Sequence, residues 1–194
     1  MEVSETTFIV IDGLDASGKS TQALRLFKFF TAKGQTVCLR FHPSSDNFFG
    51  VKAKQFLYSK GKSAHFASAL FYMADVIRSI LLYAWQKYDH VIFVRYLMGT
   101  AYLPPPLHRV AYHFFALFVP TSDTMFFLDI TPHEAYKRIR RTRKNQEMFE
   151  SINELRKVRV KGLSLALIGK WKIIDADKPT EEVEMEIQKL LKVF

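Results

Sequence analysis

The sequence predicts an α/β fold of three layers, in which helices cover both faces of a five-stranded parallel sheet. Short apolar runs alternate along the chain with longer amphipathic segments. The runs are apolar throughout, without a polar residue at every second position, which is typical of strands that are covered on both faces. The first run leads through a glycine turn into Gly-Lys-Ser-Thr. At 194 residues the chain has the length of about one domain, and we expect residues 1–194 to form one.

The first expected strand, Phe8–Ile11, is followed by a phosphate-binding motif and then at once by a helix. Gly13, Gly18, Lys19 and Ser20 match G-x-x-x-x-G-K-[ST], the P-loop motif. In such a loop the backbone N–H groups and the helix N-terminus point at an anion, so the motif predicts a P-loop NTPase fold that binds ATP. Lys19 is expected to reach the β- and γ-phosphates and Ser20 a Mg²⁺ ion. The residues expected to bind ATP are Gly13, Ala16, Ser17, Gly18, Lys19, Ser20 and Thr21.

The rest of the chain continues the alternation of strands and helices. Further strands are expected at residues 35–41, 90–94, 125–130 and 170–175, and helices at 47–59, 63–87, 107–118, 149–167 and 180–191, with another that begins at 131. Three consecutive prolines at 104–106 indicate a loop. Ligands of open parallel sheets bind where the strands end. The candidate residues for chemistry are therefore those at 12–20, 40–43, 94–96, 129 and 175.

The net charge of +9 is concentrated between Lys137 and Lys161. Such a run is either a solvated helix face or a basic flap over the phosphates of a nucleotide, and the P-loop favours the flap. A nucleic-acid partner is not expected, because no aromatic residues are interleaved among residues 138–144. The sequence shows no cluster of metal ligands beyond Ser20.

The compartment is predicted from cysteine usage and from the apolar runs. The lone Cys38 excludes an internal disulfide and is expected to be a buried thiol in the cytoplasm. Residues 1–7 do not resemble a secretory signal, and charged residues such as Asp75 and Arg78 interrupt the apolar runs before about 18 residues. We therefore expect a soluble protein without a membrane partner.

Motifs along nearly the whole chain carry a resemblance to one enzyme family. They lie at residues 13–21, 40–43, 71–75, 95–96, 127–132, 148–150 and 174–176. With these motifs the chain resembles the thymidylate kinases, which are P-loop kinases of nucleoside monophosphates. The resemblance implies phosphoryl transfer from ATP to dTMP, with Mg²⁺ as the metal ion.

The resemblance also implies roles for single residues. Asp15 would hydrogen-bond the 3′-hydroxyl of the acceptor, Arg95 would hold its phosphate, and Tyr72 would stack on the base. The residues expected at the acceptor are Asp15, Arg40, Phe41, Pro43, Tyr72, Arg95 and Tyr102. From the residues alone, Tyr72 could equally pack in the core, because aromatic stripes on helices usually do.

The basic segment corresponds to the lid of the family, at about 138–150. Some members carry a catalytic arginine in the P-loop, where this chain has Ala16, so the resemblance places the catalytic arginine in the lid. The candidates are Arg138, Arg141 and Arg143, which would act with Lys19, Asp15 and Arg95.

The chain departs from the family pattern at three positions. Val94 stands where an acidic residue usually precedes the Arg-Tyr pair, and Val76 and Leu103 replace polar residues that read the base. Two alternatives therefore stay open: a kinase for a different nucleoside monophosphate, and a nucleotide-binding protein with weakened transfer. If the acceptor is still dTMP, Arg78 is the candidate to replace the missing reader of the base. The helix expected at 63–87 resembles a dimer surface of the family, although burial within one chain would give the same pattern.

Overall fold

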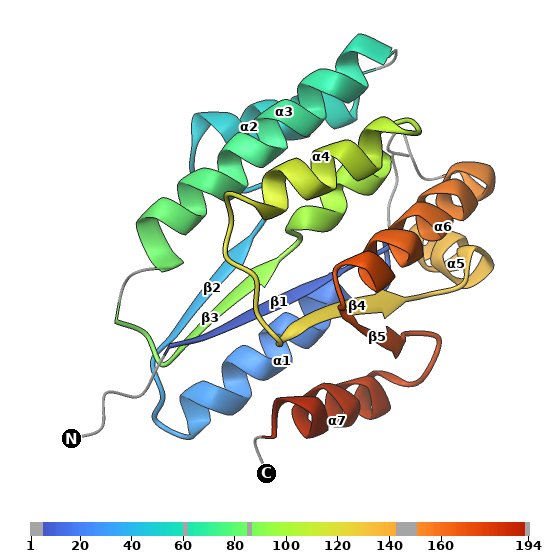
Figure 1. Ribbon diagram of the computed structural model, residues 1–194. Coiled ribbons are helices and arrows are strands. Elements are labelled where there is room, and N and C mark those ends of the chain that lie inside the picture. Colours follow the sequence, from blue (N-terminus) through green and yellow to red (C-terminus); the bar gives the residue numbers. More distant parts are fainter. Residues whose placement is uncertain (1–5, 60–61, 85–86, 143–150, 193–194) are drawn as a thin grey trace.

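The computed structural model describes residues 6–59, 62–84, 87–142 and 151–192. Its centre is a sheet of five strands, all parallel to their neighbours, in the order β2-β3-β1-β4-β5 (Figure 1). The strands are β1 (Thr7–Gly13), β2 (Val37–Phe41), β3 (His90–Val94), β4 (Met125–Asp129) and β5 (Lys172–Asp175). This architecture confirms the predicted fold class.

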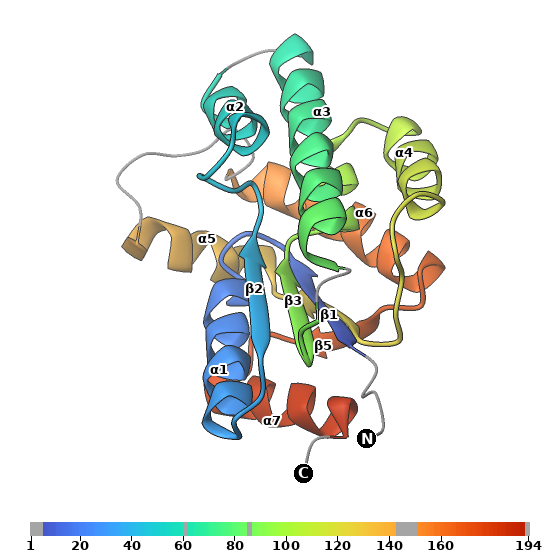
Figure 2. The same cartoon turned by 90° about the vertical axis from the view of Figure 1, so that its left-hand side faces the viewer.

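Helices cover both faces of the sheet (Figure 1, Figure 2). One face carries α1 (Lys19–Ala32) and α7 (Thr180–Leu191), and the other carries α3 (Lys62–Ser79), α4 (Leu107–Ala116) and α6 (Ile152–Ile168). The remaining elements are α2 (Phe48–Leu57), which packs on α3, α5 (Pro132–Thr142), the π turn η1 (Ile80–Ala84) and the 3-10 helix η2 (Leu97–Tyr102).

The core is built around the central strand β1. Ile9, Val10 and Ile11 are fully buried because β3 and β4 pair with β1 on its two sides and helices cover both faces. In the pairing of β1 with β3, Ile11 lies opposite Val94. This register places the residues that follow the two strands side by side, and the N–H of Arg95 donates to the carbonyl of Ile11 at 3.0 Å.

Some element boundaries differ from the sequence-based expectation. The 3-10 helix η2 was not predicted, because its segment contains Gly99 and carries no helical period of apolar residues. The strand expected from residue 170 begins at Lys172, since the N–H of Trp171 still bonds to the carbonyl of Ala166 at the end of α6. Cys38 is buried with a free thiol, as predicted.

The helix α3 and the π turn after it contain an apolar stretch, Phe66–Tyr83, that has the length and mean hydropathy, 1.4, of a membrane span. Asp75 and Arg78 lie within this stretch. Asp75 is fully buried and accepts hydrogen bonds from Ser44 and Asn47 in the loop before α2. These contacts, together with the packing of α3 on α2 and η2, join the helix to the rest of the chain, and 33% of the stretch is buried.

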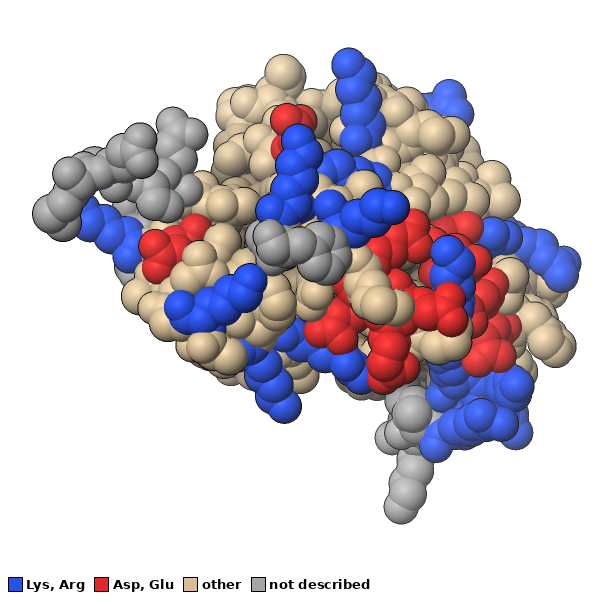
Figure 3. Space-filling view, turned by 90° about the horizontal axis from the view of Figure 1, so that it is seen from below, with Lys and Arg blue, Asp and Glu red and all other residues tan. Residues whose placement is uncertain are grey.

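The face of the molecule seen from below carries acidic side chains that gather over α7, with Lys and Arg around them (Figure 3). The glutamates of α7 are Glu181, Glu182, Glu184 and Glu186. Arg25 of α1 pairs with Glu181 and with Glu184, both at 2.6 Å, and so joins the two helices of this face. The positive net charge is therefore not spread evenly over the surface.

Candidate active site

The P-loop, residues 13–20, connects the end of β1 to the start of α1. Gly13 has a φ of +148°, and a Cβ there would lie 2.4 Å from the carbonyl oxygen of Leu128, so no other residue fits. Gly18 has a φ of +90° and stands at the N-terminus of α1. Ala16 has a φ of +60°, which is uncommon for a residue with a side chain. The loop is held in a tight turn around the helix N-terminus, the geometry that binds phosphate.

Lys19 and the exposed start of α1 line a cleft, which we call the P-loop cleft. The Nζ of Lys19 donates to the carbonyl oxygens of Gly13 at 3.0 Å and Leu14 at 2.6 Å, and its side chain is buried. The lining also includes residues 16–18 and 20–22 of the P-loop and α1, and beyond them Arg95, Arg138, Arg141, Ala176, Lys178, Thr180 and Val183. All residues predicted to bind ATP lie here except Gly13, which lines the neighbouring pocket.

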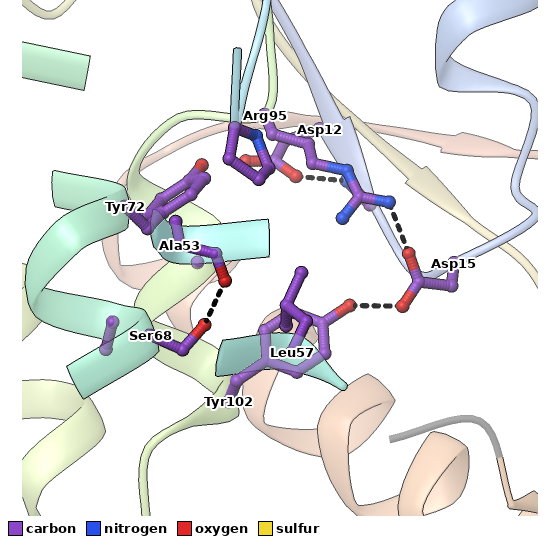
Figure 4. Close-up of a pocket in the computed structure, with 12 residues that line it drawn as sticks. Asp12, Asp15, Ala53, Leu57, Ser68, Tyr72, Arg95 and Tyr102 are labelled. Atoms are coloured by element: carbon purple, nitrogen blue, oxygen red, sulfur yellow. Dashed lines mark hydrogen bonds and ion pairs between the residues drawn. The ribbon is translucent and has the colours of Figure 1, made fainter. Parts of the chain in front are cut away.

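A second pocket, the inner pocket, lies between the end of β1 and the helices α2 and α3 (Figure 4). Most of its wall is apolar. The residues that line it are Asp12, Gly13, Asp15, Pro43, Ala53, Leu57, Ser68, Ala69, Tyr72, Arg95, Gly99 and Tyr102. The predicted residues Asp15, Pro43, Tyr72, Arg95 and Tyr102 are thus brought together from five separate segments of the chain.

Asp15 is the centre of a chain of hydrogen bonds at the mouth of the inner pocket (Figure 4). Its Oδ1 accepts from Nη2 of Arg95 at 2.5 Å, and its Oδ2 accepts from the hydroxyl of Tyr102 at 2.9 Å. Burial, and then the neighbouring Asp15, raise the pKa of the Tyr102 phenol well above its ordinary value, so Tyr102 stays protonated and donates. The three side chains fix one another in position.

Arg95 connects the two cavities, because it is the one residue of the described chain that lines both the P-loop cleft and the inner pocket. Burial alone would lower the pKa of its guanidinium, but Asp15, Tyr102 and Asp12 outweigh burial, and the pKa is raised. Arg95 is therefore a permanent cation. Its backbone has a φ of +66°, in the left-handed region that residues with a side chain rarely adopt.

Tyr72 stands in the wall of the inner pocket. Its hydroxyl donates to the carbonyl of Tyr96 at 2.8 Å, and burial raises the pKa of its phenol. A Cβ on Gly99 would lie 2.3 Å from the ring of Tyr72, so only glycine leaves the ring in place. Tyr72 is buried and packs with the core, yet it also faces the inner pocket. The core packing of Tyr72 is therefore confirmed, and its stacking on a base stays a prediction.

Asp12 is a site residue to which sequence reasoning gave no role. It is buried at the end of β1 and lines the inner pocket. Its Oδ1 accepts from the N–H of Gly13 at 2.8 Å and its Oδ2 from the N–H of Tyr96 at 2.7 Å. Burial raises the pKa of its carboxyl, whereas Lys19 and the two N–H groups act against that rise. The sequence could have indicated Asp12, because a carboxylate that directly follows a buried strand needs hydrogen-bond donors nearby.

Arg40 and Phe41 are not brought to the inner pocket. The guanidinium of Arg40 pairs with Asp46 at 2.8 Å and lies over the ring of Tyr83, and Phe41 is partly exposed. The reason is that β2 is an edge strand of the sheet, so only the loop beyond it, at Pro43, reaches the pocket.

The three positions that depart from the family pattern lie in the core. Val94, Val76 and Leu103 are all buried, and none lines the inner pocket or the P-loop cleft. Arg78, considered as a substitute reader of the base, does not line the inner pocket either. The wall between α2, α3 and η2 carries instead Ala53, Leu57, Ala69 and Gly99, with Ser68 as its polar side chain.

Two of the three lid arginines lie at the P-loop cleft. Arg138 is anchored by Glu134 at 3.0 Å, by the carbonyl of Ala176 at 3.2 Å and by the carbonyl of Ala16 at 3.5 Å. Arg141 is exposed and lines the cleft from the last turn of α5. Arg143 and residues 143–150 of the expected lid lie outside the described residues, so that prediction remains open.

Comparison with known proteins shows which family the chain resembles. A family model described as thymidylate kinase matches residues 11–187. A probable thymidylate kinase of Pyrococcus abyssi is 30% identical over 206 residues, which cover 95% of each chain. One of Thermococcus kodakarensis is 31% identical over 96% of this chain and 98% of its own, and one of Pyrobaculum aerophilum is 32% identical over 95% and 96%. The matched span contains the P-loop, the inner pocket and Arg95, and the chain belongs to the thymidylate kinase family.

Proposed function

We propose that the protein transfers the γ-phosphoryl group of ATP to dTMP and so forms dTDP. The observation that carries the proposal is the position of Arg95, which lines both the P-loop cleft and the inner pocket. A cation at this junction lies where an acceptor phosphate would meet the phosphates of a donor. Membership in the thymidylate kinase family supports the same reaction.

ATP binds in the P-loop cleft in this proposal. The N–H groups at the start of α1 hold its phosphates, and Lys19 leaves the carbonyls of Gly13 and Leu14 for the β- and γ-oxygens. Phosphoryl transfer requires little covalent help from the protein, because positioning and charge neutralisation supply most of the catalysis. Arg141 and Arg143 are the proposed lid cations, and Arg138, with its three anchors, holds α5 against the P-loop.

dTMP binds with its base in the inner pocket and its phosphate toward Arg95. Tyr72 and Pro43 enclose the base, and the methyl group of thymine fits a wall made of Ala53, Leu57 and Ala69. A carboxylate oxygen can accept more than one hydrogen bond, so Asp15 can accept the 3′-hydroxyl of the sugar while it holds Arg95 and Tyr102.

The residues at the P-loop fit a Mg²⁺ ion that is bound mainly by phosphate and water. The carboxylates of Asp12 and Asp15 are held by hydrogen bonds within the protein, and no group of three or more His, Cys, Asp or Glu residues in the described chain is arranged to hold a metal. Mg²⁺ commonly keeps several waters and binds substrate phosphates with few protein ligands. Ser20, exposed on the first turn of α1, would be its protein ligand, and the ion would neutralise charge on the transferring phosphoryl group.

We propose a cytoplasmic location and no nucleic-acid or membrane partner. The lone cysteine, with its buried thiol, supports a reducing compartment. A homodimer through α3 is part of the same proposal, supported by the exposure of Phe66 and Leu70 on that helix.

A coupled ADP-release assay over a panel of deoxy- and ribonucleoside monophosphates tests the proposed reaction. We expect dTMP to give the highest kcat/KM. Turnover with a different monophosphate alone would reassign the acceptor. ADP release that does not exceed the blank with every member of the panel would contradict a kinase and favour a nucleotide-binding protein.

A further inference from the structure

The backbone of Arg95 is held in an unfavourable conformation, and buried side chains surround the turn that contains it. A residue with a side chain persists in the left-handed region only where its surroundings over-determine it. The turn Arg95–Tyr96 follows β3 directly. Each of its two residues has one backbone carbonyl and one N–H that need hydrogen-bond partners. Three of these four backbone groups are bound by side chains, and the N–H of Arg95 by the carbonyl of Ile11.

The first of these side chains is Asp12. Its Oδ2 accepts from the N–H of Tyr96 at 2.7 Å, and its Oδ1 accepts from the N–H of Gly13 at 2.8 Å. One carboxylate therefore joins the first residue of the P-loop to the residue after Arg95. The two segments are neighbours because β1 and β3 are paired in the sheet, but backbone pairing alone does not set the φ of Arg95.

The second side chain is His42, which comes from the loop after β2. Its Nδ1 lies 3.1 Å from the carbonyl oxygen of Arg95. A carbonyl only accepts, so Nδ1 carries the proton. Burial lowers the pKa of His42 to about 4, which keeps the ring neutral at pH 7 and leaves Nε2 without a proton. Nε2 is buried and has no hydrogen-bond partner in the described chain, which agrees with a nitrogen that carries no proton.

The third side chain is Tyr72 of α3, whose hydroxyl donates to the carbonyl of Tyr96. The turn is thus bound from β1, from the loop after β2 and from α3. These same segments supply Gly13, Pro43 and Tyr72 to the inner pocket. The orientation of Arg95 and the shape of the pocket are set by one buried network.

We propose that Asp12 and His42 are positioning residues, which hold the Arg95–Tyr96 turn so that the guanidinium of Arg95 meets the phosphate of the acceptor. Asp12 lines the inner pocket, but in this proposal both residues act on the acceptor phosphate only through Arg95. The inference rests on the proposed function in so far as Arg95 binds that phosphate.

The test compares affinities for dTMP and for thymidine, measured by titration calorimetry. The ratio of the two affinities isolates the contribution of the phosphate, and hence of Arg95. We expect Asp12→Asn and His42→Ala to lower this ratio by about tenfold each, since a lost buried hydrogen bond lets the turn relax. His42→Asn should keep most of the ratio, because its amide can donate where Nδ1 does.

A matched control is Asp89→Asn. Asp89 also accepts a backbone N–H and a second donor through its carboxylate, from Thr36, but lies at the opposite end of the sheet. It should leave the ratio unchanged. In an Arg95→Ala background, Asp12→Asn should change the ratio by less than about twofold. The effects of two substitutions do not add when one residue acts through the other.

The inference and the proposed function fail on different results. Variants at Asp12 and His42 that lower only the melting temperature and keep the wild-type ratio would overturn the inference, and so would an equal loss in the Arg95→Ala background. If Asp12→Asn does not fold, the comparison of His42→Ala with His42→Asn decides alone. A protein that shows the predicted ratios but forms no dTDP would overturn the proposed function and leave the inference intact.

Discussion

The P-loop cleft and the inner pocket differ in how they can recognise a ligand. The P-loop cleft is lined by cations and by the N-terminus of a helix, with Lys19, Arg138, Arg141 and Lys178 around it. The wall of the inner pocket on α2 and α3 is formed by Ala53, Leu57 and Ala69, with Ser68 and Tyr72 as its polar side chains. The first is suited to bind by charge and the second by shape. Arg95 is the residue through which the two are joined.

The two regions also differ in the contacts that fix their conformation. The P-loop is one contiguous segment whose conformation is set by its own glycines and by the start of α1. The inner pocket is assembled from five segments and depends on buried hydrogen bonds between them. Substitutions in the P-loop should therefore act locally, whereas substitutions around the inner pocket should act through the network.

The largest expected effect is that of Lys19→Ala, which separates the two regions. Loss of one preorganised cation at the transferring phosphoryl group should lower kcat by about 10³-fold. The affinity for dTMP should stay at the wild-type value, because Lys19 does not line the inner pocket. The measurement is kcat by ADP release together with calorimetry for dTMP. A rate equal to that of the wild type would remove the P-loop from the mechanism.

Arg95→Ala should affect both regions, since its side chain lines both. We expect kcat/KM for dTMP to fall by about 10²- to 10³-fold, because the change removes a charge-assisted contact and also leaves Asp15 buried without its cation. Arg95→Lys keeps the charge but loses the planar fork, so it should recover only part of the loss. A loss confined to KM for ATP would show that Arg95 serves the P-loop cleft alone.

Acid should weaken the inner-pocket side of the molecule through His42. Its pKa is near 6.5 in the unfolded chain and about 4 in the fold, where Asp75 and Arg40 are the charged groups that act on it. The unfolded state therefore binds more protons between these values, and the free energy of unfolding falls as the pH drops. The loss between pH 7 and pH 4.5 is about 2 kcal/mol.

Urea unfolding at pH 7 and at pH 4.5 measures this effect, with His42→Asn as the variant that has no titrating group. The decline in unfolding free energy should be smaller in the variant by about that amount. An equal decline in both proteins would show that His42 does not stay neutral in the fold.

Gly99→Ala should give a smaller effect that is confined to the inner pocket. The new Cβ would lie 2.3 Å from the ring of Tyr72 and should push that ring into the space for the base. We expect KM for dTMP to rise by about tenfold and KM for ATP to stay constant. Ser68→Ala, which removes a hydroxyl from the same pocket without adding bulk, should change KM by less than about twofold. A large loss in Ser68→Ala would contradict recognition by shape.

The sequence predicted the parts of the site that are local. Gly13, Gly18 and Lys19 were found because strand, loop and helix follow one another in the chain, so spacing alone fixes their geometry. The three inner strands were found because most of their residues are buried and apolar, and the edge strands β2 and β5 from shorter apolar runs. Arg95 was found because a charged residue directly after a buried strand needs a partner.

What escaped prediction depends on contacts between distant segments. The hydrogen bonds of Asp12 and His42 with the Arg95–Tyr96 turn require the order of the strands, which no local pattern gives. The family resemblance placed Arg40 and Phe41 at the acceptor, but they lie on an edge strand of the sheet and do not line the inner pocket. The apolar wall of the pocket on α2 and α3 comes from Ala53, Leu57 and Ala69, which the sequence pattern did not distinguish from ordinary helix core.

Transfer of label from [γ-³²P]ATP to dTMP, with the product identified by chromatography, tests the central claim most directly. The claim is that Arg95 joins a donor cleft to an acceptor pocket in one active site. It predicts labelled dTDP in an amount equal to the ADP formed, and much less of it with Arg95→Ala. ADP without labelled dTDP, or labelled dTDP at an undiminished rate in Arg95→Ala, would contradict it.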